Sequence, residues 1–169
     1  MAHNNTPIVK LLLQHGANID RGTIYQAAKH ASIEIMSLLL DCGVNIDLNI
    51  GLARNTPLII AVEAGRKDMV ELLLEHGADP NLCNTSQVLA IELAIEKGYQ
   101  QIIKLLLNSE KADINWCSGK KNRPILTIAA VKRDIKLVEF LLHYGANIQA
   151  RDSTNETALI TVQFECRGP

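Results

Sequence analysis

Four cysteines and five histidines are among the side chains in this sequence that could act as nucleophiles, bases or metal ligands. The four cysteines lie far apart and include no C-x-x-C pair. They are Cys42, Cys83, Cys117 and Cys166. This spacing favours free thiols in a reducing compartment, such as the cytoplasm, over disulfides or a zinc site. The sequence therefore predicts no metal site.

Two of the histidines, His15 and His76, each stand directly before a glycine. They occupy corresponding places in a repeated pattern. Cys42, Ser109 and Tyr144 occupy the same place elsewhere, which indicates a structural or surface position. The glycines are spaced with the repeat and do not cluster after a strand, so no phosphate-binding loop is expected. No nucleophile–base pair follows from the spacing. The sequence therefore predicts a non-enzymatic protein without a cofactor.

Pairs of short helices must position these side chains, and residues 56–81 show the pattern best. Thr56 is suited to cap a helix that Pro57 begins, and Gly65 allows the chain to reverse. Apolar residues then recur at helical spacing until Gly77, which is suited to end the second helix. Neither helix can bury its apolar stripe alone. The unit therefore needs neighbours on both sides.

Copies of this unit run through most of the chain. Each contains an apolar triplet, and most steps between triplets lie close to the period of about 33 residues typical of ankyrin arrays. The triplets are Leu11–Leu13, Leu38–Leu40, Leu72–Leu74, Leu105–Leu107 and Phe140–Leu142. Related tails follow them, such as G-A-N-I-D, G-V-N-I-D and G-A-D-P-N. The chain resembles the ankyrin repeat family, in which T-P-L-H-x-A-A opens the first helix and L-L-x-x-G-A-D/N-x-N closes the second.

The resemblance implies an all-α fold, an ankyrin-repeat solenoid of stacked helix-turn-helix units with projecting loop fingers. One domain covers residues 1–169. We expect partial repeats at 1–20 and 152–169 and full repeats at 21–50, 51–83, 84–117 and 118–151. The family histidine is missing from every copy, which removes a net ~0.5–1.5 kcal/mol of hydrogen bonding from each link between repeats.

Several copies depart from the family pattern. Thr6 is expected to cap the first helix, with Pro7 at its first position. Thr23 and Gln26 suggest a capping box that starts the next helix late, and the short loop before it predicts a missing finger. The tail at 108–113 lacks the glycine, so a different turn should end its helix.

Composition excludes some classes of partner. The net charge of −1 gives no general attraction to nucleic acid or to an anionic membrane. No apolar run approaches a membrane span, and no signal peptide is visible. The chain is rich in Ile and Asn, which A/T-rich coding can produce. Such genomes include intracellular bacteria that deliver ankyrin proteins into host cells, so a host-directed effector is an alternative to an ordinary cytoplasmic protein.

The resemblance implies that partners dock on the fingers and on a concave face lined by the first helices. The matching positions on the first helices are Lys29, His30, Glu63, Glu96, Lys97 and Lys132. Those on the fingers are Asn55, Lys120, Lys121 and Arg123. The basic finger could favour an acidic peptide or phosphate, or could be a solvated loop. The concave row alternates in sign, which argues against a nucleic-acid groove. In the family, a turn asparagine is sometimes hydroxylated, and Asn81 and Asn115 match that position.

Trp116 stands where a finger begins and has two interpretations: packing over the base of its finger, or direct contact with a partner. The predicted function is a non-catalytic protein–protein interaction module. The alternative is a structural or oligomerising segment of a larger multidomain protein. Residues 8–13 are apolar and lack a preceding helix, which fits either a fragment of a longer parent, a frayed end, or end-to-end self-association.

Overall fold

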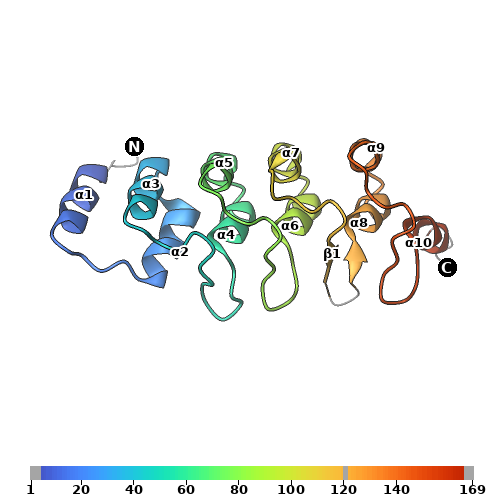
Figure 1. The fold of residues 1–169 in the computed structure, drawn as a ribbon, viewed down its shortest axis with the longest axis horizontal. Helices are drawn as coiled ribbons and strands as arrows, with labels where there is room; N and C mark the ends of the chain where they lie inside the picture. The colour runs from blue at the N-terminus through green and yellow to red at the C-terminus, as the bar shows by residue number, and fades with distance from the viewer. Residues whose placement is uncertain (1–4, 120–121, 166–169) are drawn as a thin grey trace.

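The computed structural model describes residues 5–119 and 122–165. Its helices stack side by side in two rows, with loops projecting beyond the second row (Figure 1). The helices are α1 (Thr6–Gln14), α2 (Arg21–His30), α3 (Ile33–Asp41), α4 (Pro57–Glu63), α5 (Lys67–Glu75), α6 (Ala90–Lys97), α7 (Gln100–Asn108), α8 (Ile125–Val131), α9 (Ile135–His143) and α10 (Ala158–Glu165). The predicted all-α solenoid is confirmed. One finger also contains a short antiparallel hairpin, whose strands β1 (Cys117–Ser118) and β2 (Arg123–Pro124) have two residues each.

The central repeat forms as its sequence predicts. The hydroxyl of Thr56 accepts the N–H of Ile59 at 3.3 Å, so Thr56 caps α4, and Pro57 is the first helical residue. Gly65 and Gly77 take φ values of 69° and 86°, in the left-handed region that glycine enters without strain. Thr56 and Gly77 thus mark the two ends of the helix pair α4–α5, and Gly65 lies in the turn between the helices.

The first two helices begin differently from the prediction. α1 starts at Thr6 after Asn5, without a side-chain cap, so Thr6 is not the cap. α2 starts early, at Arg21, and the carboxylate of Asp20 accepts both the N–H and the hydroxyl of Thr23 at 2.7 Å. The predicted capping box is therefore wrong, because the chain passes straight from the tail of α1 into α2 and brings Asp20 onto the first turn. The missing finger itself is confirmed (Figure 1).

An aliphatic core runs along the stack from α2 to α9. The middle residue of each inner triplet is buried, and the exposed fraction is at most 1%. These residues are Leu39, Leu73, Leu106 and Leu141. The position of the family histidine is also interior in the central repeats, where Ile59 and Thr127 are fully buried. The Thr127 hydroxyl has no hydrogen-bond partner among the described residues, so this repeat contains a desolvated polar group in place of a link between repeats.

The third tail ends its helix with a different turn, as predicted. Ser109 follows α7 in an extended conformation (φ −69°, ψ 140°), and its hydroxyl donates to the carbonyl of Leu106 at 3.0 Å. Arg133 occupies the place where the other repeats have a small residue, and its φ of 56° places it in the left-handed region. A non-glycine residue there is strained by ~1–3 kcal/mol, which the surrounding packing must offset.

Candidate functional site

A ladder of hydrogen bonds joins the tails of successive repeats. In each rung the side chain of one tail accepts a backbone N–H of the next tail. The rungs are Asp47 to Asp79 at 3.0 Å, Asn81 to Asp113 at 2.9 Å and Asn115 to Asn147 at 2.8 Å. Asn81 also donates through Nδ2 to the carbonyl of Lys111. The ladder fixes the spacing of the loops that follow it. The Asp or Asn residue that recurs in the tails was the sequence signal for the ladder, although its hydrogen bonds were not predicted.

The fingers are also bonded to one another. Thr85 donates its N–H and its hydroxyl to the carbonyl of Ala53, at 2.9 and 3.1 Å. Asn84 Nδ2 donates to Asn55 Oδ1 at 3.0 Å. The next pair of fingers is joined by the N–H of Gly119, which donates to the carbonyl of Gln87 at 2.8 Å. Asn55, which sequence reasoning placed on the partner surface, therefore also links two fingers. These bonds turn separate loops into one ridge.

The ridge leaves some side chains in solvent. Leu52 is completely exposed, with an exposed fraction of 101%, and Arg54 beside it is exposed in the same finger. Arg54 takes a φ of 53°, and its counterpart Gln87 in the next finger takes a φ of 59°. Both fingers therefore contain a left-handed residue at the same place near the tip.

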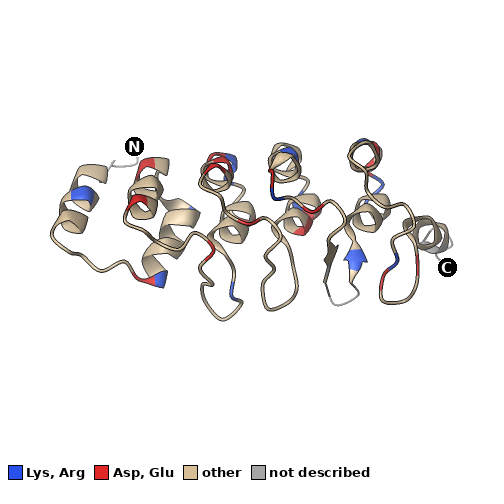
Figure 2. Cartoon of the chain, in the orientation of Figure 1, with Lys and Arg blue, Asp and Glu red and all other residues tan. Residues whose placement is uncertain are grey.

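The predicted first-helix residues lie at the ends of successive helices. Glu63, Glu96, Lys97 and Lys132 are exposed. Figure 2 shows both signs of charge interspersed along the described part of the stack. This arrangement offers a partner separate charged contacts of both signs.

Lys29 and His30 differ from the rest of that row. Lys29 is half-buried and donates to the hydroxyl of Tyr25 at 2.9 Å. That hydrogen bond, with a smaller contribution from Glu63, raises the pKa of Lys29 above its ordinary value. His30 borders a hollow of about 320 Å³ between α1 and the α2–α3 pair. Lys29 is thus already hydrogen-bonded, whereas His30 is exposed beside the hollow next to α1.

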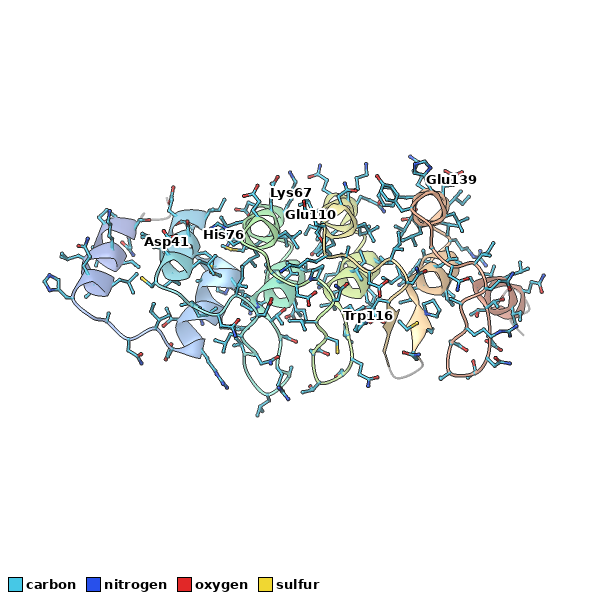
Figure 3. All side chains as sticks on the ribbon, in the orientation of Figure 1. Asp41, Lys67, His76, Glu110, Trp116 and Glu139 are labelled. Atoms are coloured by element: carbon cyan, nitrogen blue, oxygen red, sulfur yellow. The ribbon has the colours of Figure 1, made fainter. Side chains whose placement is uncertain are left out.

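Trp116 lies at the base of the hairpin finger, below α6 and beside β1 (Figure 3). It is half-buried and packs against the core, and its surroundings include Pro80, Leu89 and Ile125. The geometry agrees with packing over the base of the finger, and contact with a partner stays a prediction. Arg123 is half-buried in β2, whereas Lys120 and Lys121 lie outside the described residues.

No group of three or more metal-ligating side chains occurs in residues 5–119 and 122–165. Cys42, Cys83 and Cys117 are free thiols, and burial raises the pKa of the Cys117 thiol, which disfavours the reactive thiolate. Within the same part of the chain, no helix is long and apolar enough to span a membrane.

Stacked helix pairs, a ladder of tail hydrogen bonds and projecting fingers define a helical-repeat solenoid of the kind that carries extended binding surfaces. A family model described as ankyrin repeats (3 copies) matches residues 1–84 and 83–152, and the chain belongs to the ankyrin-repeat family. Ankyrin repeats generally mediate protein–protein interaction and are generally non-catalytic.

Similar proteins include several long chains. Ankyrin repeat protein nuc-2 of Neurospora crassa is 35% identical over 115 residues, which cover 64% of this chain and 11% of that protein. The human transient receptor potential cation channel subfamily A member 1 is 28% identical over 130 residues, 76% of this chain and 12% of that protein. Phosphocholine transferase AnkX of Legionella pneumophila is 25% identical over 141 residues, 82% of this chain and 15% of that protein. The chain thus spans a small part of each.

Proposed function

We propose that this chain binds a partner protein or an extended peptide across its fingers and the exposed ends of its first helices. The observation that carries the proposal is the hydrogen-bonded ridge of fingers with Leu52 wholly in solvent. A loop fixed before binding loses little conformational entropy when a partner docks. An exposed apolar side chain on such a loop gains burial in the complex.

Each part of this surface has its own role. Leu52 supplies the apolar contact, with Arg54 beside it. Glu63, Lys97 and Lys132 supply polar contacts at the edge, where exposed charges govern orientation and rate of association more than affinity. Since both signs are present, the partner carries both signs as well. Trp116 supports the base of the finger, and Lys120, Lys121 and Arg123 add positive charge to that finger.

A displayed peptide library selected against the full chain tests this proposal. Selected peptides should lose about tenfold or more in affinity for a Leu52→Asp, Glu63→Lys variant, because about 1.4 kcal/mol of contact energy is removed. Glu139→Lys is the matched control, since Glu139 lies on α9 at the opposite side of the stack (Figure 3). Equal binding to the finger variant and the control would contradict the proposal, provided that thermal unfolding shows both variants folded.

A second function has its own supporting observation. Ile8, Leu11 and Leu12 are 60%, 56% and 56% exposed on α1, an apolar face of the kind that mediates association. In this alternative the chain is a structural or oligomerising segment of a longer protein. A light-scattering mass of twice the chain, abolished by Ile8→Glu, supports it; a monomer at high concentration contradicts it.

The setting of either function is also a proposal. The free thiols of Cys42, Cys83 and Cys117 favour a reducing compartment such as the cytoplasm. Similarity to a Legionella pneumophila protein keeps a host-directed role as the alternative.

A further inference from the structure

The residue just before a second helix lies at the junction with the preceding repeat, and in two repeats its long side chain reaches across that junction. Before α5 this residue is Arg66, whose Nη1 donates to the carbonyl of Ala31 at 2.6 Å. Before α7 it is Tyr99, whose ring lies directly over Gly65: a Cβ added to that glycine would stand 3.0 Å from the Tyr99 hydroxyl oxygen. A long side chain therefore crosses each of these two junctions beside the start of the second helix.

Before α9 the corresponding residue is Asp134, which is too short for this task. Its carboxylate turns back to cap α9 through the N–H of Leu137 at 3.1 Å and accepts Nε2 of Gln100 at 2.8 Å. A Cβ added to Gly98, the counterpart of Gly65, would meet nothing within 4 Å. The space that Tyr99 fills at one junction is open at the next.

Asp134 also lines a groove of about 550 Å³ between α7 and α9, which we call the α7–α9 groove. A hollow of about 500 Å³ lies between the C-terminal halves of α5 and α7, and Tyr99 does not line it. Ile103, Leu107 and Leu137 form the buried floor of the α7–α9 groove, and the half-buried Phe140 forms one wall. The volume of this groove is within the range of ~300–1,000 Å³ found for ligand sites. The groove thus accommodates an apolar side chain from another molecule.

Two lysines, Lys104 and Lys136, stand at the rim of the groove, and both are exposed. The described ion pairs, Arg66 with Asp68 and Lys67 with Glu71, include neither of them. The two preceding junctions have other residues at these helix positions. These are Glu71 and Gln101 between α5 and α7, and Ser37 and Asp68 between α3 and α5. Of these three junctions, the one between α7 and α9 is therefore the one with a lysine at both positions.

We propose that the α7–α9 groove binds an acidic peptide segment that inserts one apolar side chain between the helices and places carboxylates beside Lys104 and Lys136. The groove lies along the row of second helices, on the other side of the stack from the fingers (Figure 1). This site is therefore separate from the finger surface, and the chain can hold two partners or two segments of one partner. The apolar floor supplies affinity, and the lysines select against uncharged or basic segments.

Amide chemical shifts of the full chain test the proposal, with a peptide of a central Leu-Phe pair flanked by two glutamates on each side. The expected result is that shifts concentrate on α7 and α9. A Lys104→Glu, Lys136→Glu variant should weaken binding by about tenfold or more, as expected for two reversed ion pairs. Lys67→Glu is the matched control, because Lys67 is an exposed lysine on α5, in the same row of second helices but outside the groove.

A second pair of variants tests the shape of the groove. Asp134→Tyr should place a ring in the groove that Asp134 lines and abolish binding. Asp134→Asn keeps both size and cap and removes a carboxylate from the lining, so it should bind the acidic peptide at least as tightly as the native chain does. Circular dichroism and unfolding midpoints show whether the tyrosine variant is folded. Shifts on the first-helix row, equal binding of a glutamine-flanked peptide, or undiminished binding to the folded Asp134→Tyr variant would each overturn the proposal.

Discussion

The centre of the stack and its N-terminal end contain the same apolar pattern with opposite burial. In α4, all seven residues except Glu63 are buried, whereas none of the nine residues of α1 is buried. Leu73 and Leu12 occupy the same place in their triplets, yet their exposed fractions are 0% and 56%. The difference shows that burial depends on neighbouring repeats. The repeat's own sequence supplies only the stripe to be buried.

Polar residues of the two regions differ in a parallel way. Asn81 accepts a hydrogen bond from the next tail through Asp113, whereas Asp20, at the corresponding place of the first tail, caps α2 through Thr23. The cause is the missing finger, which brings α2 directly after Asp20. The same tail position therefore stabilises a contact between repeats at the centre and a single helix at the end.

The largest expected effect comes from replacing one of the two matched leucines, Leu73 or Leu12, with alanine. Leu73→Ala creates a cavity in a fully enclosed site and should reduce the free energy of unfolding by ~2–5 kcal/mol. Leu12→Ala should reduce it by less than ~1 kcal/mol, because water already covers much of the side chain. Urea unfolding followed by circular dichroism measures both. Similar losses would show that α1 is covered in solution, for example by a second copy.

Local signals explain why much of the fold could be predicted. Thr56 and Pro57 mark a helix start, and the missing glycine in the tail at 108–113 marks an unusual helix end; both depend on adjacent residues. The cap of α2 was missed because Thr23 and Asp20 offered competing caps, and only the path of the chain decides between them.

The candidate site was less predictable for the same reason. The row of first-helix charges follows from the repeat, but the finger bonds of Thr85 and the groove left by Asp134 depend on which side chain reaches across a junction. The residues before the second helices (Arg66, Tyr99 and Asp134) vary in length. That variation in side-chain length could have indicated that the junctions differ. Only the three-dimensional arrangement shows which junctions a side chain crosses.

A ladder variant gives the next largest effect. Asn81→Ala removes the acceptor for the N–H of Asp113 and the donor to the carbonyl of Lys111, and should reduce stability by about 1–2 kcal/mol. The loss falls on the contact between repeats, so hydrogen exchange of Asp113 and its neighbours should increase. Exchange confined to the repeat of Asn81 itself would show that the ladder does not couple the repeats.

Helix caps at the centre and at the C-terminal end offer a smaller contrast. Thr56 accepts the N–H of Ile59 at 3.3 Å and is 1% exposed, whereas Thr157 accepts that of Ile160 at 3.5 Å and is 7% exposed. Thr56→Ala should reduce stability by ~1 kcal/mol, and Thr157→Ala by less. Replacement by serine keeps the hydroxyl and serves as the control in urea unfolding. A larger loss at Thr157 would contradict a stack that is held most firmly at its centre.

The smallest effect concerns pH at the N-terminal end. Hydrogen bonds from the Thr23 side chain and backbone lower the pKa of Asp20 below its ordinary value of 3.8. A carboxyl with a lowered folded pKa stabilises the fold above its unfolded pKa, and this contribution is lost as pH falls through the folded pKa. Asp20→Asn retains a capping oxygen that does not titrate. The difference in urea midpoint between the native chain and this variant should be constant from about pH 7 to 5 and should change below about pH 4. Thr23→Ala should make that change smaller, because the hydroxyl is lost while the backbone N–H of residue 23 still donates to the carboxylate. A difference that stays flat to pH 3 would show that Asp20 is not held as a charged cap.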